Sequence, residues 1–268
     1  MKHPCTSPPA SAKHRLMSKW AAHAALAACL LAAAPARATE IVVLCSTALQ
    51  STLTELTPQY QAATGDKLIV TYQSSAPLKT SIETGTAFDV AILTPAMIAD
   101  LAKSGRVIQG SARTLARANI GIAVQKGAPK PDISTPNAFK AALLAAHSVA
   151  SSVAGQSRVG LLAALDKLGI AAEVNVKTKL ITTGSTGEAV ARGEAELAVQ
   201  LIPELQAVAG LDVVGPFPAG LQSPVVLTAG VAAAAKAPTS AARLVAYLAS
   251  PDRADLIRAK GLEPGIGE

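Results

Sequence analysis

Aromatic side chains are scarce in this sequence of 268 residues, at 3% of the chain. Trp20 is the only tryptophan, and there are three tyrosines and three phenylalanines. Sites that stack sugar rings or nucleobases need several aromatic rings, so we expect neither kind of site. Half of the residues are apolar, which excludes a disordered chain. No apolar run beyond residue 38 is long enough to span a bilayer.

Basic residues are concentrated at the start of the chain. The net charge is +6, and residues 1–38 contribute +5 because they hold five basic residues and no acidic one. The remaining 230 residues therefore carry only +1. A body this close to neutral argues against a broad basic face, so we predict no nucleic-acid partner.

Residues 1–38 have the pattern of a secretory signal peptide. A basic stretch ends at Lys19, an alanine- and leucine-rich core covers 21–34, and a small-x-small cleavage pattern ends at Ala38. We predict cleavage after Ala38 and export to the periplasm. The alternatives are an N-terminal membrane anchor, for which the core is short, and a lipoprotein acylated at Cys29.

Cysteine and histidine are nearly absent beyond the predicted cleavage point, where only Cys45 and His147 occur. One cysteine forms no internal disulfide, and the pair is too small for a zinc cluster or a catalytic triad. We therefore predict no metal and no cofactor. Cys45 ends the apolar run 41–44, which favours a buried small side chain over a reactive thiol.

Short apolar segments alternate with helical patterns along the rest of the chain, which is typical of βαβ units and a mostly parallel sheet. The strands are expected at 41–45, 67–72, 88–93, 120–124, 148–152, 179–181, 197–201 and within 222–232. We predict an α/β fold of two lobes with a ligand cleft between them. Lobe 1 comprises 39–118 plus 222–268, and lobe 2 comprises 119–221; the two chain crossings form a hinge.

Four turns share one design, in which a strand ends, small hydroxyl or glycine residues follow, and a helix begins. They cover 46–48, 74–75, 151–157 and 184–187. Helix N-termini have free N–H groups and bind oxyanions, and open α/β sheets bind ligands at this edge. For any one turn, ordinary N-capping is an adequate explanation. No Gly-Lys-Ser/Thr follows them, so none is a phosphate P-loop.

Arg158 stands beside Ser157 at a predicted helix start. A guanidinium there would bind a carboxylate through two parallel hydrogen bonds, and the alternative is a solvated surface arginine. No residue is an obvious general base, since His147 and Cys45 are poor candidates, and the catalytic residues of an enzyme at this site stay unknown.

The stretch Tyr72–Thr94 resembles periplasmic molybdate-binding proteins, with an aromatic residue, a serine cluster and an Asp-Val strand. The resemblance continues through 121–124, 165–169, 192–199 and the closing helix before Gly261. It implies a two-lobe type II periplasmic binding protein fold, in which serine hydroxyls and backbone amides hold an oxyanion in the cleft. This chain looks like a divergent branch of that family, and an aconitate isomerase shares the same fold.

The resemblance transfers the ligand contacts only in part. The second serine ligand of the family falls on Ser75, but the first falls near Ala48, beside Ser46 and Thr47, and a tyrosine ligand falls near Leu201. Backbone-amide positions fall near Ser157 and Thr183. Two side-chain donors are thus missing, which makes a carboxylate ligand plausible, and Arg158 and Gln200 are possible additions. The candidate ligand-binding residues are Ser46, Thr47, Ala48, Ser74, Ser75, Ser157, Arg158, Thr183 and Gln200.

These observations and the resemblance predict a monomeric periplasmic solute-binding protein. Its ligand is a small anion, either a molybdate-like oxyanion or a carboxylate, delivered to an ABC permease in the inner membrane. The alternative is a periplasmic aconitate isomerase, which moves a carbon–carbon double bond in a tricarboxylic acid. That reaction needs a base to remove a carbon-bound proton and a group to stabilise the enolate. A sensor or surface scaffold has no positive support in the sequence.

Overall fold

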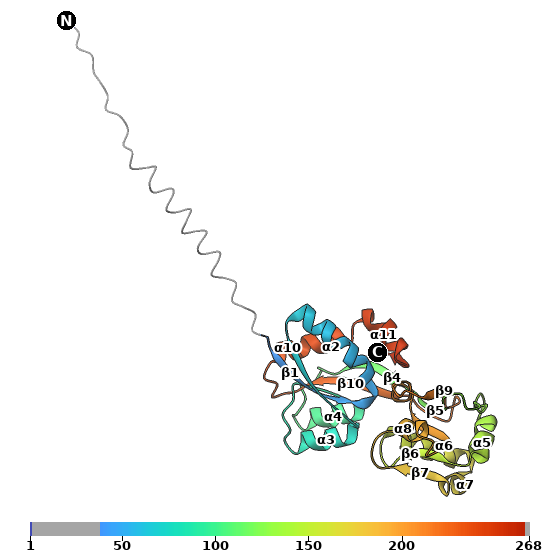
Figure 1. The fold of residues 1–268 in the computed structure, drawn as a ribbon. Helices are drawn as coiled ribbons and strands as arrows, with labels where there is room; N and C mark the ends of the chain where they lie inside the picture. The colour runs from blue at the N-terminus through green and yellow to red at the C-terminus, as the bar shows by residue number, and fades with distance from the viewer. Residues whose placement is uncertain (2–37, 266–268) are drawn as a thin grey trace. The chain divides into compact units, whose positions relative to one another are not determined.

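The chain folds around two mixed β-sheets with helices on both faces of each (Figure 1). The computed structural model describes residue 1 and residues 38–265. The predicted signal peptide therefore lies outside the described residues, apart from its two ends. Residues 39–268 form one compact unit. Within the described part, no helix is both long and apolar enough to cross a membrane.

The first sheet has six strands in the order β11-β4-β10-β3-β1-β2. They are β1 (Glu40–Ser46), β2 (Lys67–Gln73), β3 (Val90–Leu93), β4 (Arg113–Ala118), β10 (Val225–Val231) and β11 (Leu262–Pro264). Strand β1 runs parallel to β2 and β3, whereas β10, β4 and β11 are joined by antiparallel pairings. The associated helices are η1 (Thr47–Leu49), α2 (Gln50–Thr64), α3 (Ser75–Glu83), α4 (Pro95–Lys103), α10 (Pro238–Leu248), η2 (Pro251–Arg253) and α11 (Ala254–Ala259).

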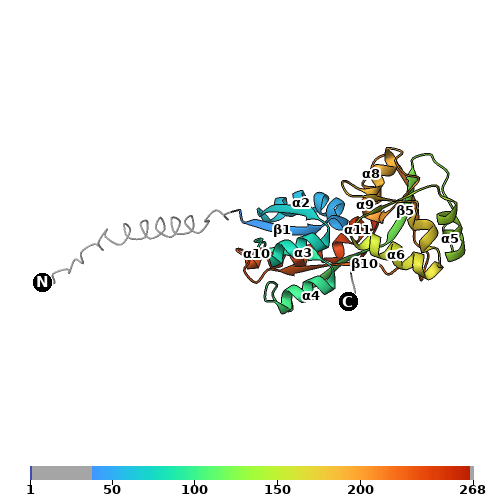
Figure 2. The ribbon, with the colours of Figure 1, turned by 90° about the horizontal axis from the view of Figure 1, so that it is seen from below.

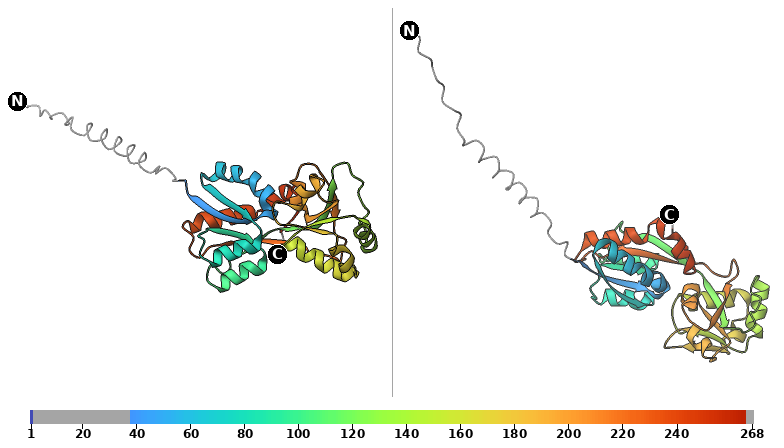
Figure 3. Two further views of the ribbon diagram at one scale, coloured as in Figure 1. Left: turned by 60° about the horizontal axis from the view of Figure 1, so that its bottom comes forward. Right: turned by 45° about the horizontal axis from the view of Figure 1, so that its top comes forward.

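The period-two pattern of β1 explains how this sheet is covered. Ile41, Val43 and Cys45 belong to the core on the side of α2 and α10, and Leu44 belongs to the core beneath α3 and α4. Because successive side chains of a strand point to opposite faces, a continuously apolar strand needs helices on both sides. Figure 3 shows the sheet between these two helical layers.

The second sheet has five strands in the order β7-β6-β8-β5-β9. They are β5 (Ile120–Gln125), β6 (Val149–Ser152), β7 (Thr178–Ile181), β8 (Leu197–Leu201) and β9 (Leu211–Pro216). The helices are α5 (Pro136–Ala145), α6 (Gln156–Leu168), α7 (Ala171–Asn175), α8 (Thr186–Ala191) and α9 (Ile202–Gln206). Figure 2 shows α8 and α9 on the other side of this sheet from α6.

The two-sheet α/β architecture confirms the predicted fold class, but the expectation of mostly parallel sheets was wrong. Only β1, β2 and β3 in one sheet and β6, β7 and β8 in the other are parallel. The remaining pairings are antiparallel, and they include β4, β5, β9 and β10, which flank the two passages of the chain between the sheets.

The chain passes between the sheets twice, after β4 and after β9. Gln222 links the two crossing segments, because its Oε1 accepts from the N–H of Ile120 at 2.7 Å and its Nε2 donates to the carbonyl of Phe217 at 3.2 Å. The lobe boundaries expected at residues 118/119 and 221/222, and their action as a hinge, stay a prediction.

Candidate functional site

A cavity of about 570 Å³ is lined by residues that follow strands of both sheets. The first sheet contributes the segments after β1 and β2, and the second sheet contributes those after β6, β7 and β8. Most of its polar side chains are serines, threonines and glutamines. The serine and threonine members are Ser46, Thr47, Ser51, Thr54, Ser74, Ser75, Ser152, Ser157 and Ser185.

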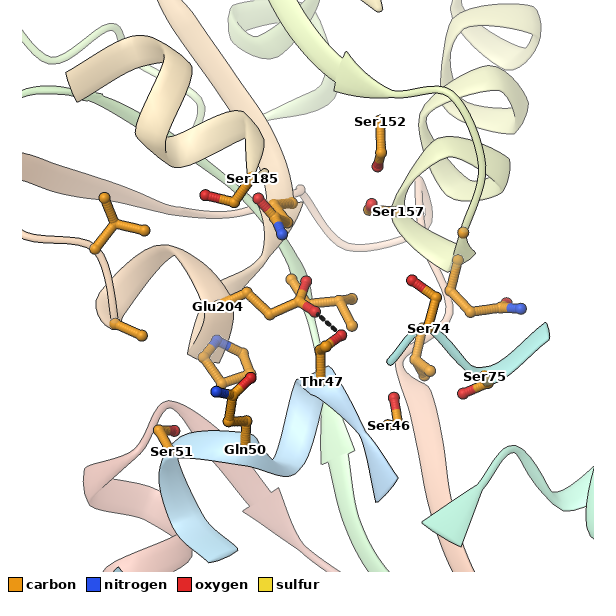
Figure 4. A pocket seen from close by; sticks show the side chains of 18 of the residues that line it. Ser46, Thr47, Gln50, Ser51, Ser74, Ser75, Ser152, Ser157, Ser185 and Glu204 are labelled. Atoms are coloured by element: carbon orange, nitrogen blue, oxygen red, sulfur yellow. Dashed lines mark hydrogen bonds between the residues drawn. The ribbon is translucent and has the colours of Figure 1, made fainter. Parts of the chain in front are cut away.

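Figure 4 shows Ser74, Ser75, Ser152 and Ser157 grouped on one side of this cavity, with Thr47 and Glu204 opposite. Ser75 and Ser157 are buried, at 7% and 5% exposure. Within the described part of the chain, the hydroxyls of these four serines have no hydrogen-bond partner. Buried hydroxyls usually have a partner, so those of Ser75 and Ser157 are available to a ligand. Ser152 is half-buried and Ser74 is exposed.

Two helices of nine and 13 residues, α3 and α6, begin at the cavity. Helix α3 begins at Ser75 and α6 at Gln156, and neither N-cap residue makes a side-chain capping bond. The first N–H groups of a helix lack partners inside the helix, and the helix dipole adds a partial positive charge there. The cavity therefore has backbone donors from both lobes that favour an anion.

The turn before α8 is different, because its serine is an ordinary cap. The Ser185 hydroxyl accepts from the N–H of Glu188 at 3.0 Å, and the Glu188 carboxylate accepts from the N–H of Ser185 at 3.0 Å. This reciprocal capping box satisfies both groups within the turn. Of the four turns singled out in the sequence, this one therefore matches the capping explanation.

No lysine, arginine or histidine is among the lining residues of this cavity, and its only acidic members are Glu188 and Glu204. An anion here would be held by neutral donors and helix N-termini. Glu204 places an acidic group in the cavity wall, close to any anion bound there. The charge of this carboxyl therefore affects the binding of an anionic ligand.

Glu204 lies in the first turn of α9, and its Oε1 accepts from the Thr47 hydroxyl at 2.6 Å (Figure 4). This hydrogen bond joins η1, after the first sheet's β1, to α9, after the second sheet's β8. Burial raises the pKa of the Glu204 carboxyl, and hydrogen bonds from Thr47, Gln200 and the backbone of Leu201 lower it by less than burial raises it.

Six of the nine residues expected from the sequence line the cavity, namely Ser46, Thr47, Ser74, Ser75, Ser157 and Gln200. Ala48, Arg158 and Thr183 do not line it. Ala48 is buried in the core of the first sheet. Thr183 is exposed. The ligand contacts themselves stay a prediction.

Arg158 follows Ser157 in α6, and successive helical residues are rotated by about 100° from each other. The Arg158 side chain therefore leaves α6 in a different direction from that of Ser157, which lines the cavity. The Nη1 atom of Arg158 is buried without a hydrogen-bond partner in the described part of the chain. Arg158 is not among the residues that line this cavity, and the two-pronged carboxylate contact expected of it stays a prediction.

Sequence reasoning missed Glu204 because it placed no helix after Leu201. The signal was nonetheless present, since Pro203 stands at the second position of α9 and Glu204 follows it, where proline and acidic residues are favoured. The same reasoning also left out Gln50, Ser51 and Thr54, which line the cavity from α2.

The remaining cysteine and histidine lie away from the cavity. Cys45 has no exposed surface, which confirms it as a buried small side chain, and burial raises the pKa of its thiol. The exposed His147 has its Nδ1 3.0 Å from Glu196 at the outer edge of β8. Among the described residues, no cluster of histidine, cysteine, aspartate and glutamate has the arrangement of a metal site.

The comparisons with known proteins agree with this architecture. The model of the family of bacterial extracellular solute-binding proteins matches residues 41–263. An aconitate isomerase from Pseudomonas sp. is 34% identical over 249 residues, which cover 90% of this chain and 95% of that enzyme. The chain belongs to the family of bacterial extracellular solute-binding proteins.

Solved structures share the fold at low sequence identity. The periplasmic molybdate-binding protein of Azotobacter vinelandii superimposes with a TM-score of 0.68 at 20% identity, covering 83% of this chain and 98% of that one. A sulfate-binding protein of Mycobacterium tuberculosis gives a TM-score of 0.68 at 18% identity, covering 84% and 87%. The resemblance to molybdate-binding proteins stated from the sequence is confirmed.

Proposed function

We propose that the protein is a periplasmic solute-binding protein whose ligand is a small anion bearing carboxylate groups. The observation that carries this proposal is the set of unpartnered serine hydroxyls at the N-termini of α3 and α6, which face one cavity from two lobes. Such donors match carboxylate or other oxyanion oxygens.

The cavity volume favours a carboxylate over a tetrahedral oxyanion. About 570 Å³ lies in the range of pockets that hold organic ligands of moderate size. A tetrahedral oxyanion would reach only a few of the donors that are spread over 74–75, 152–157 and 46–51. A ligand with two or three carboxylates could contact both helix N-termini at once.

The expected site of action is the periplasm, with delivery of the anion to an ABC permease by a monomer. The family membership supports extracellular solute binding. The pattern of residues 1–38 supports export through a signal peptide cut after Ala38.

A second candidate function is the isomerisation of aconitate. Two observations favour it: the relative of 34% identity is an aconitate isomerase, and a half-buried carboxylate, Glu204, stands in the cavity wall. A site that only held anions would gain nothing from a carboxylate, whereas a proton-transfer enzyme needs a base.

A thermal-shift panel tests the proposed ligand class, because a bound ligand raises the melting temperature by mass action. We expect trans-aconitate, cis-aconitate or citrate to raise it in a concentration-dependent manner. Molybdate, tungstate and sulfate are the comparison ligands. Stabilisation by molybdate or tungstate alone would contradict the carboxylate assignment. Loss of trans-aconitate absorbance in the same samples distinguishes the enzyme from the binder.

A further inference from the structure

Glu204 differs from every other acidic group near the cavity. Glu188, the other acidic lining residue, is exposed and is engaged in the capping box of α8. The Glu204 carboxylate accepts from the Thr47 hydroxyl and lines the same cavity as the serine group (Figure 4). It is therefore the acidic side chain that a ligand in this cavity would meet.

A chain of hydrogen bonds fixes the position of this carboxylate. The N–H and hydroxyl of Thr186 lie 3.1 and 2.7 Å from Gln200 Oε1, which accepts from them. That arrangement leaves the Gln200 amide N–H₂ to donate to Glu204. Thr47 donates from the other lobe. A carboxylate held from two sides keeps one geometry toward a bound substrate, as proton transfer requires.

The surroundings also make Glu204 a stronger base than an exposed glutamate. Its side chain is half-buried, desolvation raises the pKa of its carboxyl, and no cationic side chain lines the cavity to stabilise the ionised form. The only other titratable lining group, Glu188, is also acidic. A bound polycarboxylate adds further negative charge and strengthens the tendency of Glu204 to take up a proton.

We propose that Glu204 is the catalytic base that moves the proton in the isomerisation of an unsaturated polycarboxylate bound in this cavity. This inference rests on the second candidate function and names the residue that would perform it. Apart from Glu188, whose carboxylate is engaged in the capping box of α8, the other polar lining side chains are hydroxyls and amides. Neither is a base near neutral pH, so one group would both remove and return the proton.

The step balances without any co-reactant. Glu204 removes a proton from the methylene carbon next to a carboxylate. The C–H electron pair forms a double bond to the central carbon, and the electrons of the old double bond shift to the vinyl carbon and its carboxylate, which gives an allylic enolate. The N–H groups of α3 and α6 and the serine hydroxyls stabilise the oxyanion of that enolate. Glu204 then returns the proton to the former vinyl carbon. The double bond has moved by one position, and Glu204 is again a carboxylate.

The test compares the full protein with its Glu204→Gln variant, which keeps the size and a hydrogen-bond acceptor for Thr47. We expect the variant to convert trans-aconitate about 10²–10⁴-fold more slowly, while calorimetry shows trans-aconitate binding as tight as in the parent or tighter. In ²H₂O, the rate at which the methylene proton exchanges for deuterium should fall together with the rate of conversion. The exposed Glu194, which pairs with Arg192 outside the cavity, gives the control variant Glu194→Gln, expected to keep the parental rate.

The pH profile adds a second readout. The parental rate should fall as pH drops through the pKa of Glu204, because only the ionised carboxylate removes a proton. Glu204→Asp should retain partial activity, with a shifted dependence of the rate on pH. This variant replaces Glu204→Gln in the test if Glu204→Gln does not fold. If Glu204→Gln converts trans-aconitate at the parental rate, the role of Glu204 as the base is overturned, but the isomerase function is not. A parent that binds trans-aconitate without converting it or exchanging its proton would overturn the isomerase function as well, while anion binding stands.

Discussion

At the scale of single residues, two serines that both lie at helix N-termini have different roles. Ser75 opens α3 with a buried hydroxyl that has no partner in the described part of the chain, whereas Ser185 is engaged in a capping box. Both line the cavity. The presence of a serine does not by itself separate the two cases, since Ser and Thr are favoured in both. The difference lies in whether an acidic side chain three residues later completes the cap.

The pair Ser75→Ala and Ser185→Ala tests this distinction. Ser75→Ala should weaken anion binding by about 1–3 kcal/mol, because a ligand oxygen loses its donor, and should leave the stability of the ligand-free protein nearly unchanged. Ser185→Ala should lower stability by about 1 kcal/mol through loss of the cap and leave affinity nearly unchanged. Calorimetry and urea unfolding measure both quantities. Equal affinity in Ser75→Ala and parent would reduce Ser75 to a structural role.

The raised pKa of Glu204 predicts a pH-dependent stability. In the folded state the carboxyl titrates above its ordinary value of 4.5. The folded protein therefore binds more protons than the unfolded chain between the two values, and this contribution to stability is full below about 4.5 and is lost as pH rises through the folded pKa. The Glu204→Gln variant has no titrating carboxyl at this position, so it does not show this loss of stability with rising pH.

Urea unfolding of parent and Glu204→Gln between pH 4 and pH 8 checks this prediction without ligand. The stability of the variant relative to the parent should increase with pH, at about 1.4 kcal/mol for each unit by which the pKa is raised. A difference that is the same at every pH would mean that Glu204 titrates at its ordinary value.

At the scale of secondary-structure elements, the strands and helices around the cavity were largely predictable. The strands at 41–45, 67–72, 120–124 and 197–201 lie within one or two residues of their observed bounds, because each is a short apolar run that ends in polar residues. Helix α6 starts at Gln156 rather than near 159, since Gly155, with a φ of 114°, ends the preceding loop earlier than expected.

The elements that sequence reasoning missed are β4, α7, α9, β9 and β11. Strand β4 has the sequence RTLARA, which lacks a continuous apolar run, and its place between β10 and β11 depends on long-range pairing. Helix α9 has five residues, too few to show a helical period. The omission of α9 also explains why Glu204 was not recognised.

Gly155 gives a prediction at this scale. An alanine at a φ of 114° is strained, and relieving the strain would displace the N-terminus of α6 that faces the cavity. Gly155→Ala should therefore weaken anion binding as well as stability. Gly169→Ala, at the other end of the same helix with a φ of 65° and open space around it, is the matched control and should affect stability alone. Equal affinities in the two variants, measured by calorimetry, would contradict a role for this helix N-terminus.

At the scale of the whole molecule, two sheets meet at one cavity, and the chain passes between them twice. The contact between Thr47 and Glu204 spans 157 positions of sequence and crosses this cavity. Such a long-range pairing cannot be read from local patterns, so the sequence predicted the serine turns of the site but not the contact between Thr47 and Glu204. The cleft itself followed from the rule that ligands bind at the carboxyl ends of strands.

Export gives one prediction for the complete chain. Protein recovered from the periplasm should have the intact mass of a chain that starts at Thr39, since the small-x-small pattern ends at Ala38. Mass spectrometry of the purified periplasmic protein checks this. A diacylated species that starts at Cys29 would support the lipoprotein alternative.

The central claim is that this cavity binds a polycarboxylate through helix N-termini and serine hydroxyls. A crystal structure of the protein grown with saturating trans-aconitate tests it most directly. We predict electron density for the ligand or its isomer between the N-termini of α3 and α6, with carboxylate oxygens within hydrogen-bond distance of Ser75 and Ser157. Density elsewhere on the protein, or none in the cavity of crystals that hold the ligand at saturation, would contradict the account.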